Sequence, residues 1–337
     1  MKTILTDTLT SKKKSCNPIW FMRQAGRYLP EFQEIRKKNK DFIKLCLNSN
    51  LSSKITLQPI KRFDLDAAII FSDILMVPYA LGQEVNFIKG EGPRLSEFNL
   101  DKFLNNNTRD FERKLNPVYE AIKKTRNKLA KEKALISFVG APWTLLVYML
   151  NLKIEKNKIN QKKLEENKKI LNTIIDKLVN FLKIHIEKQM QAGASTIQIF
   201  DSWAGLIPEE DLKDLCYEPN LKLVEYCKSI NMPVICFPKG IKYKYLNFLD
   251  YVKPNGINID YDLNPIWAKE NLKNVCIQGG MDPKVLFLDD TKMFEEAEKY
   301  LKIFKNSSYI FNLGHGLLPE TQPEKVSKLI KFVRNYK

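Results

Sequence analysis

Two arginines set four residues apart, with little bulk between them, are the first feature of this sequence that could do chemistry. Arg23 and Arg27 stand in the stretch WFMRQAGRYLPEF, directly after an apolar run. A guanidinium presents a planar fork of N–H donors that binds a carboxylate through two parallel hydrogen bonds. Gly26 lies between the arginines and allows backbone angles that other residues resist. The pair therefore predicts a loop that folds around a ligand carrying more than one carboxylate.

Other polar side chains follow apolar runs at similar positions, where each run ends. Asp73 follows AAIIFS, Ser202 follows STIQIFD, and His315 stands between two glycines after SYIFNL. A carboxylate among apolar neighbours is costly unless a cation or N–H donors meet it, so Asp73 is a candidate partner for positive charge. It could equally cap the next helix. Tyr148, in LLVYML, could be a core residue of a helix or a site residue.

Eight short apolar runs, rich in β-forming residues, recur along the chain. They cover residues 18–22, 67–71, 134–139, 195–200, 233–237, 256–259, 274–278 and 308–313. Most lack strict polar alternation, which is typical of strands covered on both faces of a parallel sheet. Helical patterns lie between them, the clearest at 161–194, where Gly193 suits the helix end. The alternation predicts an α/β fold, a (β/α)₈ TIM barrel, with a doubly wound open sheet as the alternative.

The chain is longer than a barrel requires, since about 250 residues are typical and 337 are present. We place the surplus at 85–133 and 151–165, the first being an extended segment between strands two and three. No linker or repeat interrupts the chain, so we expect a single domain over residues 1–337. Active sites of such barrels lie at the carboxyl ends of the strands, where the polar residues above fall.

The charge balance limits the possible partners. Lys and Arg number 55 and Asp and Glu 39, giving a net charge of +16. Positive potential attracts nucleic acid or an anionic small molecule. The lysines are scattered rather than interleaved with aromatic residues, so we expect no nucleic acid partner, although a basic nucleic-acid-binding protein stays an alternative. The six cysteines form no CxxC pair and there are two histidines, which argues against a His-rich metal site and for a reducing cytoplasm.

One uncharged stretch, residues 134–150, must be weighed against a membrane span. It is shorter than the roughly 20 residues that a span needs, and Gly140, Ala141 and Pro142 interrupt it. A strand, a turn and the start of a helix explain it better. The first residues lack the apolar core of a signal peptide. We therefore expect a cytoplasmic protein without a membrane span.

Seven motifs resemble, in their order, those of the uroporphyrinogen decarboxylase family. They are PIWFMRQAGRYLPEF, FSDIL, GAPWTLLVYM, FDSWAG, FPKG, QGGMDP and NLGHG, spread over residues 18 to about 330. The resemblance implies a (β/α)₈ barrel enzyme, a carboxy-lyase that is usually a homodimer and uses no cofactor or metal. It implies removal of carbon dioxide from the four acetate side chains of uroporphyrinogen III, giving coproporphyrinogen III in haem and porphyrin biosynthesis.

Residue by residue, the resemblance makes Asp73 the catalytic carboxylate and implies a set of substrate contacts. That set is Arg23, Gln24, Ala25, Gly26, Arg27, Asp73, Tyr148, Ser202 and His315, with Arg36 as a further arginine. The sequence departs from the family pattern at Tyr79, Tyr261 and Gly280. None of these removes a substrate contact, and their effect on loop shape and dimer contacts is open.

A related group of barrels offers an alternative reading. Those enzymes transfer methyl groups and usually hold a zinc ion through His and Cys. Here His315 has no cysteine near it in the sequence, which favours the decarboxylase.

Overall fold

Parallel strands form one seven-stranded sheet in the computed structural model, which describes residues 2–11, 17–88, 92–155 and 158–336. In sheet order they are β1 (Ala67–Ile69), β4 (Ala134–Gly140), β7 (Thr196–Asp201), β8 (Val234–Pro238), β9 (Gly256–Ile259), β10 (Cys276–Gly279) and β11 (Tyr309–Ile310). Nearly every strand residue is buried, as expected when both faces are covered. The order follows the chain without the reversal of a doubly wound sheet, so the barrel prediction is confirmed.

The first predicted strand, 18–22, is wrong as a strand but lies where the barrel requires it. Ile19 forms a single parallel bridge with Phe311, and its carbonyl accepts a 2.9 Å bond from Asp66 N, just before β1. These bonds join the two edges of the sheet. The ladder stops there because Phe21 N donates to Gln24 Oε1 and Met22 N donates to the side chain of Asn312.

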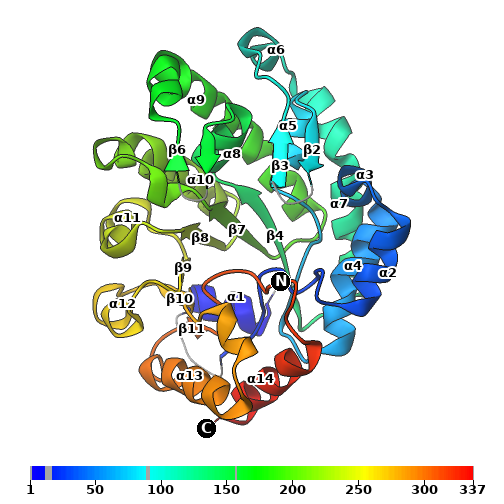
Figure 1. The fold of residues 1–337 in the computed structure, drawn as a ribbon, viewed down its shortest axis with the longest axis vertical. Coiled ribbons are helices and arrows are strands. Elements are labelled where there is room, and N and C mark those ends of the chain that lie inside the picture. The colour runs from blue at the N-terminus through cyan, green and yellow to red at the C-terminus, as the bar shows by residue number, and fades with distance from the viewer. Residues whose placement is uncertain (1, 12–16, 89–91, 156–157, 337) are drawn as a thin grey trace.

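Helices cover the outside of the sheet, as the alternating sequence pattern predicts (Figure 1). The main ones are α4 (Ser49–Arg62), α7 (Thr108–Lys128), α8 (Pro142–Met149), α9 (Gln161–Gln191), α10 (Glu218–Ser229), α11 (Tyr245–Val252), α12 (Pro265–Asn271), α13 (Asp290–Ile303) and α14 (Pro323–Asn335). The long helix α9 begins at the Asn160 cap, whose side chain accepts from Lys163 N. None of the described helices combines the length and apolar character that a membrane span requires.

Helix α1 (Ile4–Ser11) covers the amino-terminal end of the barrel. Ser308 Oγ, just before β11, donates a 2.6 Å bond to Thr8 O. Leu9 packs directly against Gly256, the first residue of β9. In Figure 1, α1 lies inside the ring of outer helices. The opposite, carboxyl end of the strands is therefore the end left for a ligand.

The predicted extended segment between strands two and three, here β1 and β4, is confirmed. It contains α5 (Met76–Ala80), an antiparallel hairpin of β2 (Val85–Ile88) and β3 (Gly92–Leu95), α6 (Leu100–Leu104) and α7. A second hairpin, β5 (Lys153–Glu155) with β6 (Lys158–Ile159), lies in the other surplus region. Helices α2 (Pro30–Lys38) and α3 (Phe42–Cys46) lie between the bridge at Ile19 and α4.

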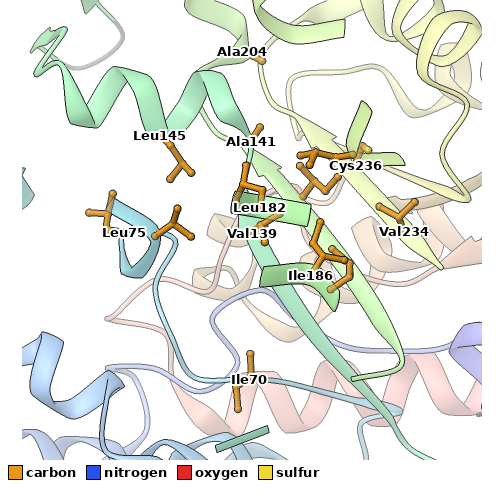
Figure 2. Close-up of a cluster of buried hydrophobic side chains, with 14 of the residues drawn as sticks. Ile70, Leu75, Val139, Ala141, Leu145, Leu182, Ile186, Ala204, Val234 and Cys236 are labelled. Atoms are coloured by element: carbon orange, nitrogen blue, oxygen red, sulfur yellow. The ribbon is translucent and has the colours of Figure 1, made fainter. Parts of the chain in front are cut away.

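Aliphatic side chains hold the helices onto the sheet (Figure 2). Leu182 and Ile186 of α9 lie in one buried cluster with Val139 of β4 and Cys236 of β8, and Leu145 of α8 belongs to it as well. Truncating a leucine in such a core typically costs about 2–5 kcal/mol. The close-packed core therefore fixes the ends of the strands, and this gives the loops that follow them defined starting positions.

Candidate active site

The arginine loop begins directly after the bridge at Ile19 and turns sharply at Arg23. Gln24 N donates to Phe21 O at 3.1 Å, closing the turn. Arg23 itself has φ of 60°, a left-handed backbone that non-glycine residues seldom adopt and that marks functional sites. At Gly26 a Cβ atom would stand 2.8 Å from Arg23 O, so only glycine fits there. The loop is built to hold the exposed side chains of Arg23 and Arg27 at the carboxyl rim.

Gln24 anchors this loop to the barrel. Its side chain is fully buried; Oε1 accepts from Phe21 N and Nε2 donates to Ala67 O of β1, both at 3.0 Å. Tyr28 Oη donates to the Gln24 carbonyl at 2.8 Å. The structure therefore gives the Gln24 carboxamide a positioning task beneath the loop. Ala25, the next residue, is half-buried.

Asp73 follows β1 and is half-buried. Its Oδ1 accepts a 2.9 Å bond from Leu75 N, which closes a turn just ahead of α5. The N-cap residue of α5 is Leu75 and no side chain caps the helix, so the alternative in which Asp73 caps this helix is wrong. Burial raises the pKa of Asp73 to about 6, while the Leu75 N–H and the Arg23 charge act in the opposite direction. Within the described ranges, no ion pair closer than 4.0 Å engages Asp73. The carboxylate therefore feels Arg23 without being neutralised by direct contact.

Tyr148 stands in the last turn of α8, where it packs against the edge of the hydrophobic core and also feels the charges of Asp73 and Arg23. Burial raises its pKa, and the charges of Asp73 and Arg23 act on it in opposite directions. Its ring packs edge-on against Trp203, with 6.0 Å between centroids. Ser202, the neighbour of Trp203, is exposed on the loop after β7. Lys153 Nζ of the β5–β6 hairpin lies 5.0 Å from the Trp203 ring centre, which adds positive charge to this side.

His315 is half-buried in the loop after β11. Its Nδ1 accepts a 2.7 Å bond from Gly316 N, which places the proton of the neutral ring on Nε2. Burial, together with the charges of Lys239 and Arg23, lowers the pKa of His315 to about 3. The imidazole is therefore a neutral N–H donor. The other histidine, His185, is buried in α9 with Nδ1 3.0 Å from Tyr119 Oη.

Arg36 is placed differently from the other predicted site residues. Its Nη1 donates to the carbonyls of Asn39 and Lys40, at the end of α2. Its guanidinium carbon also lies 5.6 Å from the ring centre of Phe42. These contacts give Arg36 a helix-end role. The structure thus brings Arg23, Asp73, Tyr148 and His315 into one electrostatic group and holds Arg36 by other partners.

The three departures from the family pattern lie on or near the rim. Tyr79 is half-buried in α5, and Tyr261, two residues after the end of β9, is 37% exposed. Gly280 follows β10 with φ of 105°, and Tyr300 Oη donates to its carbonyl at 2.8 Å. These positions shape loops at the carboxyl end of the barrel.

A buried carboxylate beneath the Ser202 loop was not assigned a role from the sequence. Asp201, the last residue of β7, accepts a 2.7 Å bond from Thr144 Oγ1 of α8. Thr144 Oγ1 in turn accepts from Trp203 N at 3.2 Å, and Asn220 Nδ2 lies 3.4 Å from Asp201. Burial raises the pKa of Asp201 to about 6. The sequence held one signal for Asp201, namely its position at the end of a predicted strand and directly before Ser202 and Trp203.

Lys239, in the motif FPKG, was also not assigned. It is the first residue after β8 and is half-buried. Burial lowers its pKa, Asp260 and Asp262 raise it, and Arg23 lowers it.

Among the described residues, no three His, Cys, Asp or Glu side chains are grouped so that they could hold a metal ion.

Comparisons with known proteins bear on this site. The family model described as "Uroporphyrinogen decarboxylase (URO-D)" matches residues 2–336. A uroporphyrinogen decarboxylase of Rickettsia bellii (strain RML369-C) is 43% identical over 333 residues, covering 95% of each chain. One from Campylobacter jejuni subsp. jejuni (strain 81-176) is 41% identical over 339 residues, covering 98% of each.

A solved structure agrees in fold. A methyltransferase from Methanosarcina mazei superposes with a TM-score of 0.79 at 17% identity, covering 98% of this chain and 97% of its own. At that identity the likeness concerns the barrel and not the reaction.

Proposed function

The chain belongs to the uroporphyrinogen decarboxylase family, and we propose that the rim around Arg23 and Asp73 is its active site. It is an enzyme of porphyrin biosynthesis that decarboxylates uroporphyrinogen. The full reaction in our proposal converts all four acetate side chains of uroporphyrinogen III to methyl groups, giving coproporphyrinogen III. The observation that carries the proposal is a half-buried carboxylate, Asp73, held at the strand ends within the field of Arg23.

The substrate can supply its own electron sink. Protonation of a pyrrole ring carbon makes the ring an iminium-like cation conjugated to the acetate. The C–CO₂ bond then breaks, its electron pair neutralises the ring, and an enamine with an exocyclic methylene forms. Protonation of that methylene gives the methyl group, and loss of the first proton restores the pyrrole. One proton is consumed for each carbon dioxide released.

Asp73 is proposed to stabilise the cationic ring. A negative charge fixed in a water-poor site stabilises the cation of the transition state more than the neutral ring of the substrate. With a pKa of about 6, Asp73 is ionised at neutral pH. The Leu75 N–H fixes Oδ1, which leaves Oδ2 for the pyrrole N–H groups. Two proton sources suit the site, a water molecule and the Arg23 guanidinium. Arg23 is accessible at the rim, but the surrounding protein removes part of its hydration, and this loss together with the Arg27 charge lowers its pKa.

The remaining predicted residues hold the periphery of the macrocycle in this proposal. Arg23, Arg27 and the neutral His315 donate to carboxylates, with Tyr148 and Ser202 on the side of α8 and β7. Ala25 and Gly26 give the ligand room, Gln24 positions the loop, and Arg36 steadies the end of α2. The acetate that reacts should not be fully paired with an arginine, because strong pairing would stabilise the ground state.

The proposal also covers the domain organisation, the cellular compartment and the oligomeric state of the protein. Residues 1–337 are taken as one domain, because segments near both ends of the chain meet at the bridge of Ile19 and Phe311. Five cysteines in the described ranges are buried free thiols, which suits a reducing cytoplasm. A homodimer without a nucleic acid partner follows from the family resemblance and the scattered lysines.

One assay tests the proposed function. The purified protein is incubated anaerobically with uroporphyrinogen III, and the products are oxidised and separated by their number of carboxylates. We expect porphyrins with seven, six, five and finally four carboxylates. A protein that leaves the octacarboxylate unchanged, yet transfers methyl groups in a zinc-dependent manner, would support the alternative instead. Metal analysis of the same preparation separates the two readings.

A further inference from the structure

We propose that Lys239 is a further substrate-binding residue, whose ammonium holds a carboxylate of the tetrapyrrole on the side of the mouth opposite the arginine loop. The inference rests on the proposed function and extends it. It concerns the motif FPKG, to which the proposed chemistry assigns no role.

The backbone of Lys239 is fixed at the carboxyl rim. Lys239 N donates to Asp201 O at 3.1 Å, and Gly205 N donates to Lys239 O at 2.9 Å. These bonds tie the end of β8 to the loop that carries Ser202. In the sheet order, three strands separate β8 from the bridge at Ile19 on either side. Lys239 therefore starts across the barrel from Arg23.

The side chain nevertheless reaches the same space as the arginine loop. Arg23 lowers the pKa of Lys239, and Lys239 and Arg23 both lower that of His315. All three groups thus feel one another across the mouth. Because its backbone is fixed at the carboxyl rim, this mutual influence is consistent with an ammonium that shares the ligand space with the arginine loop.

Lys239 lacks a direct counter-ion. It is half-buried, and in the described part of the chain no carboxylate oxygen approaches its Nζ within 4.0 Å. Asp260, one of the two carboxylates whose charge acts on Lys239, already accepts from Gly240 N at 2.7 Å and Tyr245 Oη at 3.3 Å. Asp260 and Asp262 stabilise the ammonium through their fields alone. Partial burial of an unpaired cation is unfavourable, so a carboxylate from the ligand would complete the site.

The chemistry of the substrate fits such a partner. Uroporphyrinogen carries carboxylates around its whole perimeter, and one loop with two arginines grips only part of it. An ammonium is a compact point charge with three rotatable donors, suited to a mobile acetate or propionate. Lys239 would then bind a carboxylate on a different pyrrole ring from the one held by Arg23, and so fix the orientation of the macrocycle.

Two substitutions and a matched control test this role. K239Q removes the charge, K239R keeps it, and K228Q removes an exposed lysine from the end of α10, next to the amino end of β8. With uroporphyrinogen III under anaerobic conditions, we expect KM of K239Q to rise about 10- to 100-fold, the value of one charge-assisted hydrogen bond. K239R should recover part of the loss, and K228Q should match the unmodified protein.

The main rival role is structural. If Lys239 serves only as a counter-ion for Asp260 and Asp262, K239Q will lower the melting temperature while KM stays unchanged, and the inference fails. It fails equally if KM and stability are both unchanged. A rise in KM with kcat and melting temperature preserved supports it.

A second readout does not depend on turnover. The protein is trace-acetylated with and without uroporphyrin I, a stable octacarboxylate, and each lysine is quantified by mass spectrometry. Uroporphyrin should protect Lys239 and leave Lys228 unaffected; equal labelling of Lys239 in both samples would overturn the inference. A protein that shows this protection but no decarboxylation would refute the proposed function and leave the Lys239 site standing.

Discussion

The aliphatic part of Arg23 packs against Gly316 so closely that a Cβ atom at position 316 would stand 2.6 Å from Arg23 Cγ. The contact joins the loop after the first bridge to the loop after β11, and so links Arg23 to the neighbour of His315. A single methyl group at residue 316 must displace the Arg23 side chain.

We therefore expect Gly316→Ala to move Arg23 without unfolding the protein. Because Arg23 would lose its place beside Asp73, KM for uroporphyrinogen III should rise about tenfold or more, in keeping with one weakened charge-assisted bond. Steady-state kinetics and a thermal melt on the same sample check this. Normal KM with an intact fold would show that the Arg23 position does not matter for binding.

Gln24 offers a test of the loop anchor. In Gln24→Ala the amide of Phe21 and the carbonyl of Ala67 lose their partners in a fully buried setting. An unsatisfied buried group costs about 1–3 kcal/mol, so we expect the free energy of unfolding to fall by about 2–4 kcal/mol and KM to rise.

The matched control for this substitution is Gln33→Ala. Gln33 is exposed and donates a single bond to Arg27 O, so its loss should change stability by about 0.5 kcal/mol or less. Urea denaturation of the two variants decides the matter. Equal stability of both would contradict the anchoring role of Gln24.

The seven strands could be predicted because short apolar runs rich in β-forming residues end in polar or glycine-containing sequence. The run 18–22 is also apolar, but the amide partners of Phe21 and Met22 are side chains at positions 24 and 312. The Gln24 bond is local but depends on a turn that composition does not reveal, and the Asn312 partner lies 290 residues away. The strand was therefore predicted where the structure has one bridge.

The site could be predicted in part for a related reason. A parallel barrel collects the residues after its strands on one rim, so Arg23, Asp73 and His315 could be proposed as site residues from their positions, and the family resemblance then gave them roles. The roles of Gln24, Arg36 and Lys239 depend on which side chains or carbonyls meet them, and those contacts are tertiary. Asp201 shows the same limit, because its partner Thr144 comes from another helix.

The pH dependence of activity should follow Asp73. Burial raises its pKa to about 6, and the proposed role needs the ionised form, so kcat/KM should fall as pH drops below about 6 and level off above it. The stability linkage has the opposite sign: the native state binds the Asp73 proton more tightly than the unfolded chain, so this group favours folding more at pH 5 than at pH 7. Anaerobic rates between pH 5 and 8 test the first statement. Undiminished activity at pH 5 would contradict it.

The two histidines should remain neutral throughout that range. Burial lowers the pKa values of His185 and His315 to about 3, and the chain has no other histidine. In ¹H–¹⁵N NMR spectra of the imidazoles, neither ring should titrate above pH 5, and the His315→Gln variant assigns the signals. If the signals absent from the His315→Gln spectrum titrate near pH 6.5 in the unmodified protein, His315 is not the neutral donor proposed here.

The most direct test of the central claim is the turnover of Asp73→Asn at pH 7, beside Asp250→Asn, which removes an exposed carboxylate from α11. Asparagine keeps the shape but not the charge, so we expect kcat of Asp73→Asn to fall about 10³-fold or more, roughly the effect of removing one group that stabilises transition-state charge. Its melting temperature should be unchanged or higher, because burial of the carboxylate charge is unfavourable. Asp250→Asn should behave like the unmodified protein. Near-normal turnover by a folded Asp73→Asn variant would contradict the account.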